Sequence, residues 1–293
     1  MNQVSDRLAA LAPSQTLAMS QKSSELKAQG VDVINLSVGE PDFNTPQHIK
    51  DAAKKAIDDN FSHYSPVPGY MDLRQAICAK LKNENGLDFT PEQIVVSNGA
   101  KQSICNTILA LVNPGDEVIL PAPYWVSYVE MVKLAEGKNV IIETGIEQDF
   151  KMTPAQLEAT ITPKTKLIFL CNPNNPTSSQ IDRQTMRIIL DNCKEHGSFV
   201  VVDETYVEFA PHPEEITSIP LAEYYNNLII LRGISKFFAA PGLRLGYAVC
   251  GNRKLLHEID SKKNPWTINS LAAIAGEIMF RDKAYIHDTY QLI

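Results

Sequence analysis

The sequence predicts an α/β domain in which helices cover both faces of a mostly parallel β-sheet. Two observations predict it. Short runs rich in β-branched residues alternate with longer amphipathic segments, the order that strand–helix–strand units produce. Several runs, such as Phe199–Val202, are apolar on both faces, as buried parallel strands are. Ligands in such sheets bind beyond the carboxyl ends of the strands, so polar residues that follow strands are the candidate functional residues.

The same patterns place each element along the chain. Strands are expected at Val33–Val38, Ile94–Ser97, Glu117–Leu120, Val140–Glu143, Lys166–Cys171, Phe199–Asp203, Leu228–Leu231 and Leu245–Cys250. Helices are expected at Pro46–Asp59, Tyr70–Asn83, Ala100–Val112, Tyr124–Glu136, Arg183–His196, Trp266–Phe280 and Ala284–Leu292.

Composition excludes several classes of protein. The formal net charge of −7 argues against nucleic-acid binding, which requires basic surfaces. The five cysteines are odd in number and form no CxxC pair, which argues against a disulfide framework or a zinc site and for a reducing compartment. Met1–Gln15 lacks the pattern of a signal peptide, and no apolar run approaches the ~20 residues of a membrane span. We therefore expect a cytoplasmic protein that binds neither membrane nor metal.

Two segments that follow strands carry candidate binding groups. Ser97–Ser103 places Gly99 and Ala100 at a strand-to-helix junction, where free N–H groups and the helix dipole favour a phosphate. Asn172–Thr177 contains two X-Pro steps, which stiffen the loop and present an asparagine amide. In isolation, a capped helix explains the first segment better than a phosphate site does, and an Asx/Pro turn explains the second equally well.

Two further segments carry charge. Asp203 ends an apolar strand, where a carboxylate requires a cationic partner such as a protonated ring nitrogen. Lys236 lies in a loop of small and apolar residues, and desolvation lowers the pKa of a lysine and makes its amine a nucleophile toward an aldehyde. Arg244, farther along the same loop, has the geometry to pair with a phosphate.

In order and spacing, these motifs resemble those of the class I/II aminotransferases, enzymes of fold type I that depend on pyridoxal 5′-phosphate (PLP). The resemblance runs from Asn35 to Gly276. It implies a mostly parallel seven-stranded sheet flanked by helices, with a partial small domain. The expected division is an N-terminal arm with part of the small domain (1–45), a large PLP-binding domain (46–265), and a linking helix with the start of an incomplete small domain (266–293).

The resemblance also implies the residues that act on the PLP ring. Lys236 is expected to form the imine with PLP and to move the substrate proton, and Asp203 to pair with the pyridine nitrogen. Asn175 and Tyr206 are expected to bind the phenolic oxygen of the ring. Trp125 is expected to stack on the ring face. The catalytic set implied is thus Lys236, Asp203 and Tyr206.

The phosphate and the substrate have their own implied residues. Phosphate contacts are expected from the helix start and from the lysine loop, namely Gly99, Ala100, Lys101, Ser235 and Arg244. Tyr64 resembles the tyrosine that reaches a phosphate in the neighbouring subunit, which implies a homodimer with shared active sites. Gly39, Trp125 and Asn175 are expected to contact the substrate, an amino acid or a 2-oxo acid.

The chain departs from the family pattern at Ser178, where glycine is usual, and at Gly233, where a phosphate-binding Ser or Thr is common. Family members also continue well past the position of Ile293 and carry there the arginine that binds the substrate carboxylate. We therefore expect weak catalysis or none from this chain alone, with cofactor binding retained.

The function implied is amino-group transfer between an L-amino acid and a 2-oxo acid. The first half resembles bacterial aspartate aminotransferases. The second half, including Asp203–Phe209 and Ala240–Tyr247, resembles histidinol-phosphate aminotransferase and threonine-phosphate decarboxylase. An amino-acid-phosphate decarboxylase and a non-catalytic PLP-binding domain therefore remain alternatives.

Overall fold

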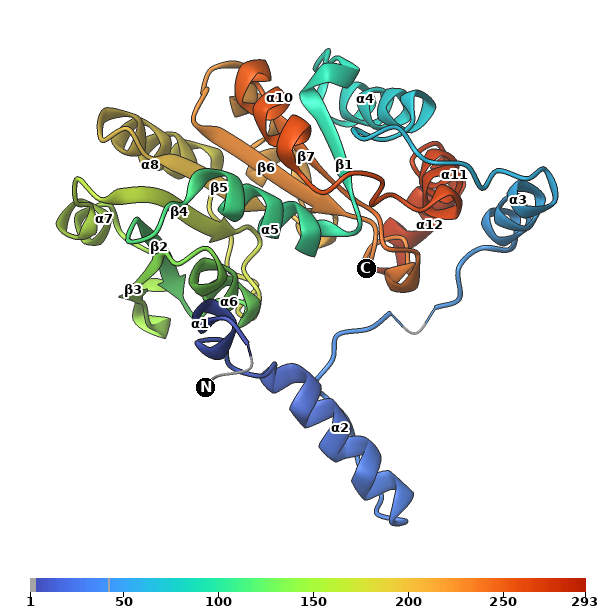
Figure 1. Ribbon diagram of the computed structural model, residues 1–293, viewed down its shortest axis with the longest axis horizontal. Helices are drawn as coiled ribbons and strands as arrows, with labels where there is room; N and C mark the ends of the chain where they lie inside the picture. The colour runs from blue at the N-terminus through green and yellow to red at the C-terminus, as the bar shows by residue number, and fades with distance from the viewer. Residues whose placement is uncertain (1–3, 42) are drawn as a thin grey trace.

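A seven-stranded β-sheet organises the protein, and the computed structural model describes residues 4–41 and 43–293 (Figure 1). Its strands are β1 (Ile94–Ser97), β2 (Glu117–Ala122), β3 (Lys138–Glu143), β4 (Thr165–Cys171), β5 (Phe199–Asp203), β6 (Leu228–Gly233) and β7 (Gly246–Cys250). They lie in the order β1-β7-β6-β5-β4-β2-β3. β7 is antiparallel to β1 and β6, and all other neighbours are parallel, as the sequence predicts.

Helices surround the sheet and form the arm that precedes it. They are α1 (Asp6–Ala9), α2 (Gln15–Ala28), α3 (Gln47–Asp58), α4 (Met71–Asn85), α5 (Ala100–Leu111), α6 (Ser127–Leu134), α7 (Pro154–Thr160), α8 (Arg183–Glu195), α9 (Pro213–Ile216), α10 (Arg253–Lys262), α11 (Ser270–Met279) and α12 (Lys283–Leu292). None of the helices in residues 4–41 and 43–293 is both long enough and apolar enough to cross a membrane.

The core has two halves because successive strand residues point to opposite faces of the sheet. In β5, Val200 and Val202 pack on one face, and Val201 packs on the other. The first face is covered by α4, α8 and α11, and the second by α5, α6 and α10. Both faces of the central strands are therefore buried, which explains why these strands are apolar throughout.

One predicted strand is wrong, and two predicted helices begin later than expected. Val33–Val38 is not a strand: Ile34 and Leu36 are 84% and 90% exposed, and within the described residues no strand pairs with this segment. The helix predicted from Trp266 begins instead at Ser270, because Trp266 has φ +54° and Asn269 caps the N–H of Ala272. The helix predicted from Tyr124 begins at Ser127.

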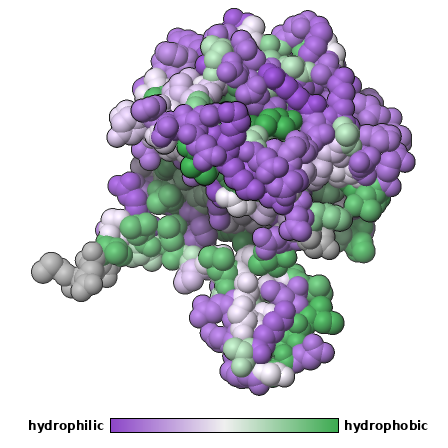
Figure 2. All heavy atoms as spheres, turned by 90° about the vertical axis from the view of Figure 1, so that its right-hand side faces the viewer, coloured by the Kyte–Doolittle hydropathy of each residue, from purple (hydrophilic) through white to green (hydrophobic). Residues whose placement is uncertain are grey.

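The N-terminal arm contains a helix that the sequence pattern does not indicate. α2 mixes polar and apolar side chains around its circumference, so it lacks an amphipathic stripe. It projects from the body of the molecule and is joined to α3 by a long irregular segment (Figure 1). Apolar side chains lie along one side of this projecting part (Figure 2). In α2, Leu17 and Met19 are 69% and 60% exposed. α1 lies against α6, where the N–H of Ala12 donates to Glu130 (2.8 Å).

Candidate active site

The candidate residues meet where β4, β5 and β6 end. Cys171, the last residue of β4, is paired with Asp203, the last of β5, and Asp203 is paired with Leu231 of β6. The three strands are parallel, so the loops that follow them leave the same edge of the sheet. The sequence motifs are therefore brought together as predicted, although they are far apart in the chain.

Lys236 lies in the loop after β6 and is half-buried. Its Nζ donates a hydrogen bond to the carbonyl oxygen of Gly39, which comes from the irregular segment after α2. Burial lowers the pKa of Lys236; the Glu40 carboxylate opposes this shift and the Arg244 guanidinium adds to it. A lowered pKa increases the fraction of neutral amine, the form that attacks an aldehyde.

A cavity of about 560 Å³ opens beside Lys236. Its walls include Gly39, Tyr206 and Phe237, together with Tyr285 and Ile293 from the C-terminal end of the chain. This volume lies within the usual range for small-molecule and cofactor sites. The reactive amine thus borders a space large enough for a cofactor.

Asp203 is buried and has only neutral donors around its carboxylate. Its Oδ1 accepts from the backbone N–H (3.0 Å) and the hydroxyl (2.6 Å) of Thr205, and its Oδ2 accepts from the hydroxyl of Tyr128 (2.8 Å). Burial raises the pKa of Asp203 above its usual value. None of the ion pairs among the described residues includes Asp203. A cation such as a protonated pyridine nitrogen would balance this charge.

Tyr206 and Asn175 lie on the loops after β5 and β4. Burial raises the pKa of Tyr206, and the charges of Cys171 and Asp203 raise it further, so its hydroxyl remains a donor. In the loop after β4, neighbouring amides are fixed: Asn172 donates to the carbonyls of Ile181 (3.0 Å) and Ile216 (3.1 Å).

Asn174 in this loop is fixed as well, because it donates to the carbonyl of Pro123 (3.1 Å) and to Thr177 (2.8 Å). Asn175 differs from its neighbours: its side-chain amide makes no hydrogen bond within the described part of the chain. The loop is thus held by Asn172 and Asn174, while the amide of Asn175 is free to bind a ligand.

The start of α5 forms a cradle for an anion. Gly99 has φ +81°, and a Cβ at this position would overlap the guanidinium of Arg244. A Cβ at Gly246 would meet the backbone nitrogen of Ala100. Arg244 is fixed by hydrogen bonds to the carbonyls of Pro241 (3.0 Å) and Asn98 (3.4 Å). A guanidinium and the first free N–H groups of a helix therefore converge where small residues leave the backbone accessible.

The side chain of Lys101 contributes in a way that the sequence does not indicate. Its Nζ lies 5.0 Å from the ring centroid of Trp125, a cation–π contact. Burial lowers the pKa of Lys101, and Arg244 adds to this effect. Trp125 also packs edge-on against Tyr128, with ring centroids 5.4 Å apart. The indole is therefore held between two side chains at the edge of the site.

Two expected residues make no side-chain hydrogen bond to this cluster within the described part of the chain. Tyr64 is 82% exposed, and its ring packs on Trp266 with centroids 4.8 Å apart. Ser235 is half-buried, and its hydroxyl makes no hydrogen bond to the residues that the structure describes. The roles of both remain predictions.

The two departures from the family pattern have structural consequences. Ser178 has φ +64°, the left-handed region that glycine adopts without strain. A Cβ at Gly233 would lie 3.2 Å from the Cβ of Ala100, so any larger residue there requires the start of α5 to shift.

Sequence reasoning misses Tyr128, Thr205 and a buried charge cluster behind the site. The donors to Asp203 are not evident from motifs, although Tyr128 lies three residues after Trp125, a helical spacing. The cluster joins two basic and three acidic side chains on the opposite side of β5 and β6, namely Lys80, Glu84, Glu204, Glu208 and Arg232.

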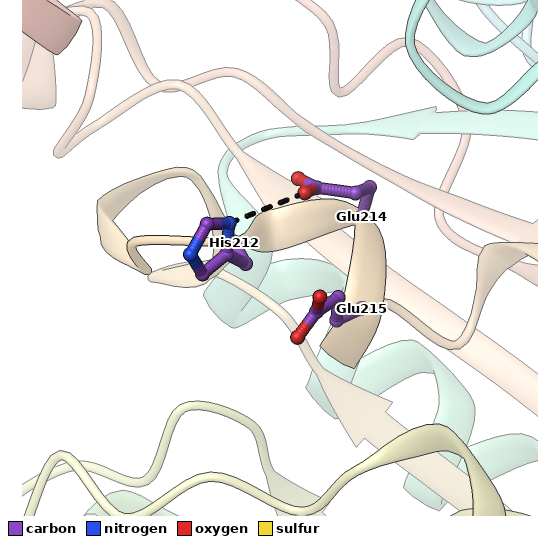
Figure 3. Close-up of side chains that lie close together, drawn as sticks. All are labelled: His212, Glu214 and Glu215. Carbon is purple, nitrogen blue, oxygen red and sulfur yellow. Dashed lines mark ion pairs between the residues drawn. The ribbon is translucent and has the colours of Figure 1, made fainter.

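Another group of potential ligands lies apart from the site. His212, Glu214 and Glu215 each place one ligand atom within 4.8 Å of the others, and all three are exposed (Figure 3). His212 Nδ1 is 3.4 Å from Glu214 Oε1. Exposed groups of this kind are common on protein surfaces, so we assign no metal to them.

The site residues fit PLP. The cradle of Gly99, Ala100 and Arg244 suits a phosphate, the buried carboxylate of Asp203 suits a protonated ring nitrogen, and Lys236 is an amine of lowered pKa beside a cavity.

Comparison with known proteins agrees with this chemistry. The family model for class I and II aminotransferases matches residues 31–291. The chain is 41% identical over 283 residues to an aspartate/prephenate aminotransferase from Nitrosomonas europaea, covering 94% of this chain and 70% of that protein. It is 41% identical over 278 residues to an aspartate aminotransferase from Geobacillus stearothermophilus, covering 92% and 70%. These matches span both halves of the chain, so the predicted resemblance of the second half to histidinol-phosphate aminotransferase is not supported.

Solved structures confirm the fold. The aspartate aminotransferase from Thermus thermophilus with maleate superposes with a TM-score of 0.92 at 35% identity, covering 100% of this chain and 76% of that one. The enzyme from Rhizobium meliloti gives a TM-score of 0.87 at 31% identity, covering 100% and 74%. The chain therefore belongs to the class I and II aminotransferases, which are PLP-dependent transaminases.

Proposed function

We propose that the protein transfers the amino group of L-aspartate to a 2-oxo acid such as 2-oxoglutarate. The observation that carries the proposal is that Lys236 and Tyr206 line one cavity, Asp203 ends the strand that precedes Tyr206, and Arg244 lies at the helix start beside Gly99. The names of its relatives, aspartate aminotransferase and aspartate/prephenate aminotransferase, support aspartate as the amino donor. They do not support a histidinol-phosphate substrate or a decarboxylase.

Four residues would act on the reacting atoms or on the cofactor ring. Lys236 would bind the cofactor covalently and, once substrate displaces it, carry a proton from the substrate Cα, because its lowered pKa favours the neutral amine. Asp203 would keep the ring nitrogen protonated, and Tyr206 with Asn175 would donate to the phenolic oxygen. PLP supplies an electron sink for the charge that develops at Cα.

The remaining residues would orient the cofactor and the substrate. Gly99, Ala100, Lys101, Ser235 and Arg244 would hold the phosphate through backbone N–H groups, a hydroxyl and a guanidinium. Trp125 would cover the ring face, since its indole is already fixed between Lys101 and Tyr128. Gly39 would donate its backbone N–H to the substrate carboxylate, since its backbone lies beside Lys236.

We also propose the domain division 1–45, 46–265 and 266–293 and a homodimer with shared sites. The 82% exposure of Tyr64 is what a residue that reaches a partner subunit requires. The uncovered apolar side chains of α2 support an arm that packs against further protein. The five cysteines, all within the described residues, are unpaired, which supports a cytoplasmic location.

A half-reaction tests the proposed activity with high sensitivity. Protein loaded with PLP is mixed with L-aspartate, and oxaloacetate is quantified over a single turnover. We expect one oxaloacetate per site, and none from Lys236→Ala. Prephenate and 2-oxoglutarate are then compared as acceptors. Release of CO2 in place of oxaloacetate, or no product from the loaded wild type, would overturn the proposal.

Mixing two inactive variants tests the shared site. Lys236→Ala and Tyr64→Ala subunits are combined after dissociation and reassociation. A homodimer with shared sites regains part of the activity, because one of its two sites receives both native residues. Independent monomers regain none.

A further inference from the structure

We infer that Tyr128 is a positioning residue of this site: its hydroxyl fixes the Asp203 carboxylate and its ring fixes Trp125, so that one side chain aligns two cofactor contacts. The inference rests on the proposed function, because it concerns how tightly Asp203 binds the ring nitrogen of PLP.

The hydrogen bond to Asp203 is buried and specific. Tyr128 is 1% exposed, and its hydroxyl lies 2.8 Å from Oδ2 of Asp203. Thr205 serves only the other oxygen, Oδ1. Within the described residues Tyr128 is therefore the one donor to Oδ2, and its loss leaves the carboxylate torsion restrained only by Thr205.

Tyr128 remains a donor over the working pH range. Burial raises its pKa well above the ordinary value, and the charges of Asp203 and Cys171 raise it further. The hydrogen bonds from Thr205 and Tyr128 in turn lower the pKa of Asp203, against the larger effect of burial. Without the Tyr128 hydroxyl, Asp203 holds a proton more readily and becomes a weaker anionic partner for a cation.

The ring of Tyr128 acts separately from the hydroxyl. It meets Trp125 edge-on, with an interplanar angle of 83°, and packs on Phe169 with ring centroids 4.4 Å apart. Phenylalanine would keep both contacts, since only the hydroxyl oxygen is lost. Tyr128→Phe therefore isolates the hydrogen bond, whereas Tyr128→Ala removes both effects.

The first test uses the protein without cofactor. The pKa of the Asp203 carboxyl is measured by carbon NMR in wild type, in Tyr128→Phe and in the matched control Tyr225→Phe. Tyr225 is also buried and donates to an aspartate, Asp191 (2.9 Å), but it lies outside the site. We expect the pKa of Asp203 to rise in Tyr128→Phe and to stay unchanged in Tyr225→Phe.

The second test adds PLP. We expect Tyr128→Phe to bind PLP about tenfold more weakly than wild type, the effect of one hydrogen bond to a charged group. The pKa of the lysine–PLP imine, read from its absorbance against pH, should rise, because a less charged ring nitrogen repels the imine proton less. Tyr225→Phe should match wild type in both measurements.

The outcomes separate the inference from the proposed function. Wild type that binds no PLP overturns the proposed function. Wild type that binds PLP, with Tyr128→Phe equal to Tyr225→Phe in affinity and in both pKa values, leaves the function standing and overturns the role of Tyr128.

Discussion

Arg232 and Glu204 form a fully buried ion pair directly behind the candidate site. Arg232 Nη2 lies 2.9 Å from Glu204 Oε2, and the two side chains are 4% and 0% exposed. Glu204 follows Asp203 in the chain, and Arg232 immediately precedes Gly233. Because neighbouring residues at the strand ends point to opposite faces, Asp203 faces the site while Glu204 anchors the strand end from the other side.

Removing the arginine should destabilise the protein strongly. Arg232→Met leaves Glu204 buried without its closest cation, and we expect the free energy of unfolding to fall by about 3–5 kcal/mol. This change in the free energy of unfolding is measured by urea denaturation. The double variant Arg232→Met/Glu204→Gln should regain part of the loss. Lys55→Met, which breaks an exposed pair with Asp59, is the control and should change stability by less than about 1 kcal/mol. Equal effects of Arg232→Met and Lys55→Met would contradict this account.

A side chain at Gly246 should disturb the phosphate cradle. The Cβ of Gly246→Ala would overlap the backbone nitrogen of Ala100, so the start of α5 must move. We expect a loss of about 1–3 kcal/mol in stability and a weaker affinity for PLP, measured by unfolding and by cofactor titration. Gly242→Ala is the matched control, because nothing lies within 4 Å of its Cβ position. If Gly246→Ala and Gly242→Ala both bind PLP as tightly as wild type, the start of α5 does not form a phosphate cradle.

The buried carboxylate of Asp203 should lower the stability of the folded protein, although it is needed to bind the cofactor. Its pKa in the folded protein lies above the ordinary value of an aspartate, mainly because of burial. The folded state then binds more protons than the unfolded state, so stability falls as pH rises through the folded pKa. Without cofactor, Asp203→Asn should therefore be more stable than wild type at neutral pH, by about 1 kcal/mol or more, and the difference should vanish in acid. The same variant should bind PLP more weakly.

An aspartate with the opposite shift provides the control for this pH dependence. The N–H of Thr185 lowers the pKa of Asp182, which caps α8. That stability is present at neutral pH and is lost as pH falls through the folded pKa. Asp182→Ala should cost about 0.5–2 kcal/mol at neutral pH and less in acid. If Asp203→Asn lowers the free energy of unfolding as Asp182→Ala does, burial of the Asp203 carboxylate carries no stability cost, and this account is contradicted.

Replacing Ser178 by glycine should make the protein more stable to heat. It holds a left-handed conformation, which costs roughly 1 kcal/mol for a residue with a Cβ. Ser178→Gly should raise the thermal midpoint, and Gly86→Ala, at φ +71° with open space around it, should lower the midpoint by a similar amount. No change in Ser178→Gly would mean that the loop relaxes to relieve the strain.

The central strands could be predicted from the sequence because burial on both faces demands apolar residues at every position. The observed bounds of β1 and β5 match the prediction. Val33–Val38 is also rich in apolar residues, although Asn35 and Ser37 interrupt it, but strand formation depends on a neighbouring strand, and the sequence does not show whether one is adjacent. The helix α6 begins at Ser127 and not at the predicted Tyr124, because Val126 lies in a turn in which the N–H of Tyr128 donates to the carbonyl of Trp125 (3.1 Å).

The candidate site is predicted from residues at or after the ends of strands, as for Asp203 and Lys236, and Arg244 is predicted from the same loop as Lys236. Tyr128 could not be found, because its bond to Asp203 joins positions 75 residues apart. The pair of Arg232 and Glu204 was missed for a similar reason: a charged residue in a strand motif does not reveal which face it occupies or which helix covers it.

The measurement that tests the central claim most directly is chemical mapping of the lysine that binds PLP. The protein is incubated with PLP, reduced with borohydride, digested and analysed by mass spectrometry, with Lys236→Ala and Lys101→Ala treated in parallel. We predict a phosphopyridoxyl group on Lys236 in wild type and in Lys101→Ala, and loss of the bleachable absorbance band in Lys236→Ala. A label on another lysine, or a bleachable band that survives in Lys236→Ala, would contradict the account.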